Sequence, residues 1–214
     1  MNLTKMLELT ISARKNILNS YELENMLRQL ILEEETAKAG GNGAKNRLKL
    51  AQKYIESSAK QNPHRNLLHA VHYALEKQWL CNGYSIIGLT NHITGLPEAS
   101  EKLQIENIIP DSNNSEYQQL DIVIDIPALK AQAREAKAEE KSTKIESTKR
   151  IVKLGNSYFN VNLVLEALAL MPGKYIVLGN TEKSNTPILI KNENDDTALI
   201  IPVRKRKDDN NNDE

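Results

Sequence analysis

The chain has 214 residues, 40% of them hydrophobic and 26% charged, and its 28 lysines and arginines balance 28 aspartates and glutamates. This length fits one or two modest domains, and the apolar fraction is too high for a disordered chain. The single cysteine excludes a disulfide framework and a cysteine-based zinc site. Because the net charge is zero, any contact with nucleic acid requires basic residues gathered on one face.

The first third of the sequence has the periodicity of amphipathic helices. Apolar residues recur at helical spacing over residues 3–18, 22–31, 48–59 and 67–75. Asn62 and Pro63 end the third of these segments. We therefore predict an N-terminal helical region over residues 1–62. No segment approaches the roughly 18 uninterrupted apolar residues of a membrane span, so we expect a soluble, cytoplasmic protein.

The rest of the sequence predicts an α+β domain over residues 63–203. Short apolar or β-branched runs bounded by turn residues indicate strands at 84–90, 121–126, 150–154, 174–178, 187–191 and 198–203. Helices are expected at 127–141, where Pro127 suits the first helical position, and at 159–171. Residues 98–115 are predicted to form a loop. The charge-dense residues 204–214 are predicted to form a disordered tail.

Two parts of this domain resemble each other. A helix predicted to begin at Asn66 leads to residues 83–91, and a helix predicted to begin at Asn162 leads to residues 173–181. In both, a helix is followed by a glycine and by a strand that contains a tyrosine and ends in glycine, asparagine and threonine residues. The pattern indicates two α/β half-units packed as one domain. Coincidence is the alternative, because helix–glycine–strand is a common arrangement.

Catalytic and metal-binding motifs are nearly absent. His69 and His72 stand at i, i+3 and could share a metal, but without an HExxH motif we interpret them as solvated surface histidines. Cys81 is interpreted as a small buried hydrophobe. Asp121 and Asp125 could bind a cation, although acids on an edge strand more often discourage edge pairing. We therefore expect no enzymatic activity, no cofactor and no metal site.

The helix predicted at 127–141 carries the most informative basic residues. Four cations recur every three or four positions: Lys130, Arg134, Lys137 and Lys141. This spacing places them on one side of the helix, where they could follow DNA phosphates without reading bases. The alternative is a solvated helix whose own acids offset that charge: Glu135, Glu139 and Glu140.

Three ordered segments near the C-terminus follow the pattern of a known family. Residues 158–168 (YFNVNLVLEAL) look like an FNxxYLLDAL helix, residues 186–190 (TPILI) are similar to an sPvlI strand, and residues 199–204 (LIIPVR) resemble a closing vMPmR segment. Together they resemble the bacterial DNA polymerase III beta subunit, the sliding clamp. The similarity covers residues 150–204 and is only suggestive over 64–126, where residues 88–92 (GLTNH) stand at the position of an ATDGxR-like segment.

The resemblance implies one clamp-like domain of two α/β half-units that holds duplex DNA without reading its sequence, as a processivity factor in DNA replication does. It also implies a hydrophobic cleft that receives peptides from replication proteins such as a polymerase. By resemblance, the residues bordering that cleft would be Leu163, Ile188, Ile201, Pro202 and Val203. The alternative is a clamp-fold protein-interaction or regulatory module that does not encircle DNA.

The chain also departs from the family. A bacterial clamp subunit has three such domains and this chain has room for one, so a ring would need about six copies or a partner. The segment 159–171 carries a single charge, Glu166, which is unusual for a helix that faces DNA. The first 60 residues have no counterpart in the family. These differences favour a short clamp-like protein of phage or mobile-element origin, which would be a homo-oligomer if a ring forms.

Overall fold

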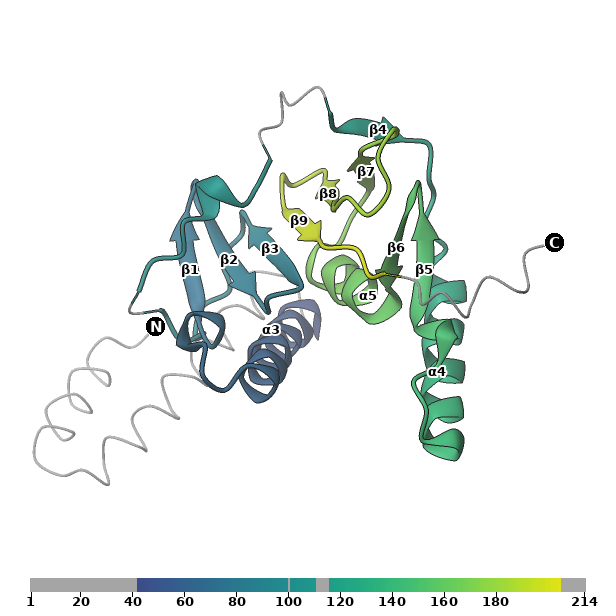
Figure 1. Cartoon of the computed structure of the whole chain (residues 1–214). Coiled ribbons are helices and arrows are strands. Elements are labelled where there is room, and N and C mark those ends of the chain that lie inside the picture. The colour runs from purple at the N-terminus through teal and green to yellow at the C-terminus, as the bar shows by residue number, and fades with distance from the viewer. Residues whose placement is uncertain (1–41, 100, 111–115, 205–214) are drawn as a thin grey trace, which may run out of the picture.

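The computed structural model describes residues 42–99, 101–110 and 116–204. The helices predicted at 3–18 and 22–31, and the tail predicted at 204–214 except its first residue, lie outside the described residues. Within them the fold is α+β, as predicted, with an antiparallel sheet and α-helices packed on one of its faces (Figure 1).

The sheet of the described residues has seven antiparallel strands in the order β1-β2-β3-β9-β8-β7-β4. The strands are β1 (Val71–Ala74), β2 (Lys77–Cys81), β3 (Ser85–Leu89), β4 (Gln118–Leu120), β7 (Tyr175–Gly179), β8 (Ile188–Asn192) and β9 (Thr197–Ile200). Two three-strand meanders, β1-β2-β3 and β7-β8-β9, meet through the antiparallel pair β3–β9. A separate hairpin joins β5 (Ile151–Leu154) to β6 (Ser157–Asn160).

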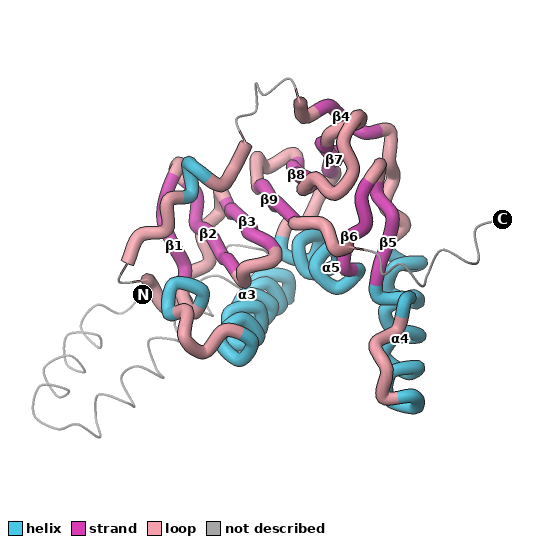
Figure 2. Tube along the Cα trace, in the orientation of Figure 1, coloured by secondary structure: helices cyan, strands magenta, loops and turns pink. Residues whose placement is uncertain are grey.

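The described α-helices are α3 (Asn42–Gln61), α4 (Ile126–Thr143) and α5 (Val161–Leu170). Single 3-10 turns form η1 (Asn66–Leu68), η2 (Ile105–Asn107) and η3 (Thr148–Arg150). Helix α5 contacts both α3 and α4, and α3 also contacts β2. Figure 2 shows α4 projecting away from the sheet beside the β5–β6 hairpin. No helix in the described part of the chain is both long and apolar enough to cross a bilayer.

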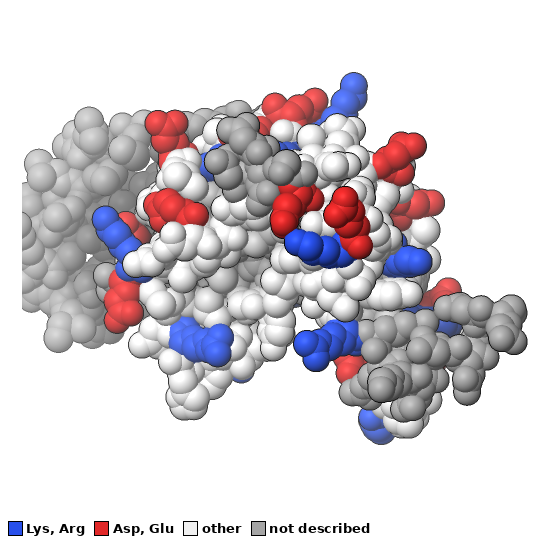
Figure 3. Space-filling view, turned by 45° about the horizontal axis from the view of Figure 1, so that its top comes forward, with Lys and Arg blue, Asp and Glu red and all other residues white. Residues whose placement is uncertain are grey.

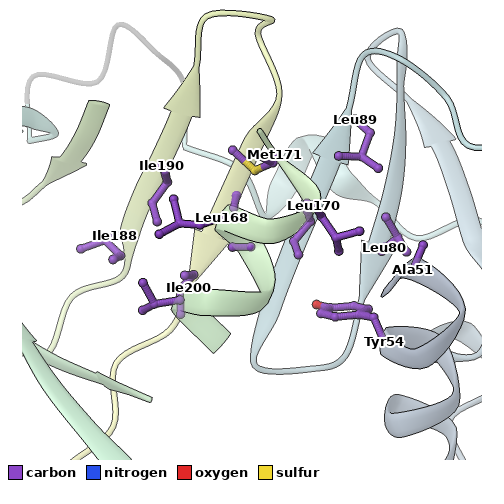
Figure 4. Packing of buried hydrophobic residues seen from close by; sticks show 14 of the residues in the cluster. Ala51, Tyr54, Leu80, Leu89, Leu168, Leu170, Met171, Ile188, Ile190 and Ile200 are labelled. Carbon is purple, nitrogen blue, oxygen red and sulfur yellow. The ribbon is translucent and has the colours of Figure 1, made fainter. Parts of the chain in front are cut away.

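Helix α5 lies at the centre of the main core. Its side chains Val164, Ala167 and Leu170 are at most 1% exposed, and burying an aliphatic side chain of valine or leucine size contributes about 1.5–3 kcal/mol. Figure 4 shows the end of α5 between side chains of two groups: Ile188, Ile190 and Ile200 on one side, and Ala51, Tyr54, Leu80 and Leu89 on the other. The single charge of this segment is therefore explained by burial.

The opposite face of the sheet is covered by a smaller apolar cluster around Trp79, which packs with Ile105 of η2. Trp79 lies against Gly88 of the neighbouring strand, where a Cβ would come within 2.6 Å of the indole ring. The glycine is needed for this packing. Both faces of the central strands are thus buried, so these strands carry continuous apolar runs.

Polar contacts attach α3 to α5 and to the sheet. Arg47 Nε donates to the Leu170 carbonyl at 3.1 Å, and its guanidinium lies 3.6 Å from the buried carboxylate of Asp196. The hydroxyl of Tyr54 donates to the Ser85 carbonyl at 2.9 Å. The sequence predicts a separate helical region that ends at residue 62. Because α3 packs with the sheet, the packed unit begins before that residue.

Most elements predicted in the second half of the chain are confirmed within a few residues. These are α4, β5, α5 and the strands β7, β8 and β9, together with β3 and the helix α3 from the first half. The strand predicted at 121–126 is wrong. The strand β4 precedes it, and Asp125 instead caps α4, its carboxylate accepting from the Ala128 N–H at 2.9 Å. Residues 157–160 form β6 before α5 begins, so the predicted helix starts too early.

The helix predicted at 67–75 is also wrong. Residues 66–68 form the turn η1 and residues 71–74 form β1, which pairs with the unpredicted strand β2. The apolar spacing at 67–75 arises from a 3-10 turn followed by a strand with a buried Val71. The first of the two similar segments therefore lacks its predicted helix, because no α-helix begins at Asn66.

Candidate nucleic-acid interface

Helix α4 positions the basic row predicted from the sequence. The helix begins after the Asp125 cap with Pro127 in its first turn and ends at Lys144 in the left-handed conformation. Leu129 and Ala136 are its buried residues. The four cations Lys130, Arg134, Lys137 and Lys141 are all exposed, and residues three and four apart on a helix are neighbours. The helix therefore presents the row as one continuous stripe to solvent.

The acidic residues of α4 do not offset this stripe, because they have other partners. Lys149 pairs with Glu135 at 3.2 Å and with Glu139 at 4.0 Å, and Arg150 pairs with Glu140. The bond from Arg150 lowers the pKa of Glu140 and keeps it ionised. Within the described residues, no member of the stripe has an ion pair.

A cleft of about 520 Å³ opens beside this stripe. It is bounded by α3, α4, the first turns of α5 and the segment after β9, and we call it the helical cleft. Three cations from distant parts of the sequence line it: Lys53, Lys137 and Arg150. Lys137 belongs to the α4 stripe, so the stripe reaches the cleft at this residue, and Glu135 and Glu139 lie on the other side of the helix, where they pair with Lys149.

Glu166 of α5 also lines the helical cleft. Burial raises the pKa of this carboxyl, and the charge of Lys53 opposes that effect only in part. Since a carboxylate repels phosphate, Glu166 weakens the attraction of the cleft for anions. Arg150 is paired with Glu140 and Lys53 acts on Glu166, so Lys137 is the lining cation without an acidic partner among the described residues.

The residues predicted to border a peptide cleft do not all come together. Leu163 and Val203 both line the helical cleft. Ile201 is 37% exposed, and the backbone N–H groups of Ile201 and Val203 donate to the carbonyls of Tyr84 and Tyr158. Pro202 is half-buried between them. Ile188, at 2% exposure, is part of the main core and offers no surface to a partner.

His72 and Cys81 have structural roles. His72 is only 4% exposed, so its interpretation as a surface residue is wrong. Its Nε2 donates to the Leu67 carbonyl at 2.6 Å and its Nδ1 accepts from the Leu103 N–H. Cys81 is buried, as predicted, and burial raises the pKa of its thiol. The described residues contain no group of three histidine, cysteine or acidic side chains that could hold a metal.

Sequence reasoning did not single out three residues of the helical cleft: Lys53, Tyr84 and Arg150. They lie on α3, before β3 and in η3, and only the folded chain brings them together. The sequence did contain a signal for Lys53, because Lys49, Lys53 and Lys60 recur at helical spacing on the exposed side of α3.

Charge elsewhere on the surface is mixed. Figure 3 shows lysine and arginine side chains interspersed with aspartate and glutamate over one face of the molecule, with no single basic patch among the described residues there. A neutral protein needs basic residues gathered in one place to contact DNA. In the described part of this chain, that gathering is found at α4 and its cleft.

Comparisons of the chain with protein-family models, with curated proteins and with solved structures gave no match. Its function has to be inferred from its own residues.

Proposed function

We propose that the chain is a sliding-clamp-like accessory protein of DNA replication that binds duplex DNA without sequence preference, through phosphates, and offers a peptide cleft to replication proteins. The observation that carries the proposal is the stripe Lys130, Arg134, Lys137 and Lys141, exposed and without ion pairs in the described part of α4. Lys53 adds a cation from α3 to the lining of the helical cleft, which Arg150 also lines while it is paired with Glu140.

The order of the elements supports a clamp-like architecture of two half-units. Helix α3 precedes the meander β1-β2-β3, and helix α5 precedes the meander β7-β8-β9. The two meanders join through β3 and β9, and the two helices pack against each other on the same face. In this arrangement the repeated unit is a helix followed by three strands, and it begins with α3 rather than at Asn66.

Phosphate contacts of this kind have a measurable signature. Each contact between a cation and a phosphate releases condensed counterions, so the logarithm of the binding constant falls with the logarithm of the salt concentration by about 0.9 per contact on duplex DNA. Base contacts are not required, so we expect similar affinity for duplexes of unrelated sequence.

The proposal predicts the behaviour of charge reversal on α4. The double variant Lys130→Glu/Arg134→Glu should bind a duplex more weakly than the unmodified chain and show a salt slope shallower by about 2, since two phosphate contacts are lost. Fluorescence anisotropy with a labelled duplex at several salt concentrations measures both quantities.

The matched control is Lys102→Glu/Lys174→Glu. It changes the net charge by the same amount at two exposed lysines outside α4 and the cleft. It should keep the salt slope of the unmodified chain. Equal losses in the two double variants, or no salt-dependent binding by the unmodified chain at low salt, would contradict the proposal.

The second candidate is a protein-interaction module that keeps the fold without binding DNA. It is favoured by Leu163 and Val203, which share the helical cleft, and by the exposed Ile201 beside them. Absence of DNA binding together with loss of a partner protein in a Val203→Asp variant would support this candidate over the first.

A further inference from the structure

We infer that the helical cleft receives an unpaired nucleotide, so that the protein prefers duplex DNA with a single-stranded extension over blunt duplex. This inference rests on the proposed DNA binding and adds a site for a base next to the phosphate contacts. The residue that carries it is Tyr84, a cleft-lining aromatic side chain that is 51% exposed.

The backbone of Tyr84 is fixed on both sides while its ring stays accessible. Asn82 Oδ1 accepts from the N–H groups of Tyr84 and Ser85 at 2.9 and 2.8 Å. The Tyr84 carbonyl accepts from the Ile201 N–H at 3.0 Å. An exposed aromatic ring on an immobilised backbone is a ready stacking surface, because little ordering is left to occur on binding.

The groups around Tyr84 match the other parts of a nucleotide. Lys53 and Lys137 line the cleft from two different helices, α3 and α4, and can supply positive charge to the phosphates of a nucleotide. The lining also includes the amide side chains of Gln61 and Asn162, which can both donate to and accept from the edge of a base. A ring, cations and amides together are the components of single-strand binding sites.

The size of the cleft decides between a paired and an unpaired ligand. Its volume of about 520 Å³ lies within the range of roughly 300–1,000 Å³ of pockets that enclose one small ligand. A duplex cannot enter such a space, whereas one nucleotide separated from its partner base can. An acidic peptide could occupy the same cations, so the test below includes it as the outcome that overturns the inference.

The test compares two labelled DNA molecules, a blunt duplex and the same duplex with a short single-stranded extension, by fluorescence anisotropy. We expect the full chain to bind the extended duplex more tightly. Tyr84→Ala should reduce binding of the extended duplex by about 5-fold to 150-fold, the range for loss of one stacked base, and should leave blunt duplex binding unchanged. Tyr84→Phe keeps the ring and should retain the preference.

The matched control is Tyr73→Ala. Tyr73 is 46% exposed and lies on β1, outside the helical cleft. It should retain the preference, and thermal melting of each variant checks that it is folded. Equal binding of both DNA molecules by the unmodified chain, or the same loss on both in Tyr84→Ala, overturns the inference. Binding of an acidic peptide that Tyr84→Ala abolishes, without a preference for extended DNA, also overturns it.

The proposed function and this inference fail in different ways. If only the preference for the extension is missing, binding of blunt duplex through α4 stands. If neither DNA molecule binds at low salt, the proposed function fails as well.

Discussion

At the scale of single residues, Glu166 shows how position on α5 changes the chemistry of a carboxyl. Burial raises its pKa above the ordinary value of 4.5, and Lys53 lowers it by a smaller amount. A carboxyl with a raised pKa in the folded state stabilises the fold when protonated. That contribution is complete below the ordinary pKa and is lost as the pH rises through the raised pKa.

Replacing this carboxyl predicts a pH-dependent change in stability. Glu166→Gln removes the charge, so the melting temperature of the variant relative to the unmodified chain should rise as the pH increases from 4 to 7. Each kcal/mol gained corresponds to about 2–4 °C for a chain of this size. Melting followed by circular dichroism across this pH range measures the difference. A difference that is constant with pH, or that falls as the pH rises, would show that burial does not control this carboxyl.

At the scale of elements, the turn between β1 and β2 has an unusual composition. Leu75 and Glu76 connect the two strands with φ of 50° and 60°. Two-residue hairpin turns with positive φ at both positions strongly favour Asn-Gly, because a Cβ is strained in this conformation. Leu75 is also 53% exposed, so it adds little to the core.

We predict that Leu75→Asn/Glu76→Gly stabilises the protein by about 1–2 kcal/mol, because it relieves strain at both positions. Urea denaturation measures the change. The control Leu75→Gln removes the exposed apolar side chain but retains a Cβ at positive φ, so it should leave the free energy of unfolding nearly unchanged. An equal gain in the control would assign the effect to the side chain and not to the backbone.

Some elements of the fold could be predicted from the sequence and others could not. Helix α4 was predictable because its cap, its Pro127 and its spacing are all local signals. Strands β1 and β2 were not, since their hairpin lacks the glycine or asparagine that marks such a turn and its apolar spacing imitates a helix. The strand before α4 was misplaced because the acidic residue at its end, Asp125, serves as a helix cap.

The candidate site also has one part that the sequence predicts and one part that it does not. The α4 stripe follows from spacing within one helix, so the sequence alone gives its members. The helical cleft joins Lys53, Tyr84 and Arg150 across about 100 residues of chain, and pairing of strands β3 and β9 decides that proximity. Ile188 was expected at a surface by resemblance, but strand alternation turns its side chain into the core.

At the scale of the whole molecule, the question is whether copies of the chain can close into a ring. Edge-to-edge pairing of sheets would use the outer edges of β1 and β4, the two terminal strands of the described sheet. The edge of β1 is already occupied at Val71, whose N–H donates to the Pro97 carbonyl and whose carbonyl accepts from Ala99. The strand β4 has only three residues, so neither edge offers a long row of free backbone groups.

We therefore predict that the free protein has the mass of one chain, 24.1 kDa, and that it binds DNA on the side of α4 and the helical cleft without encircling it, so that the proposed clamp-like role would rest on phosphate contacts and not on a ring. Light scattering coupled to size exclusion, with and without a short duplex, measures the mass of each species. A one-sided binder should also dissociate from a closed circular duplex as readily as from a linear one, because it has no ring to open. A free mass of several chains, or retention on circular DNA that is lost when the circle is cut, would instead establish encirclement and would require an interface other than the two sheet edges.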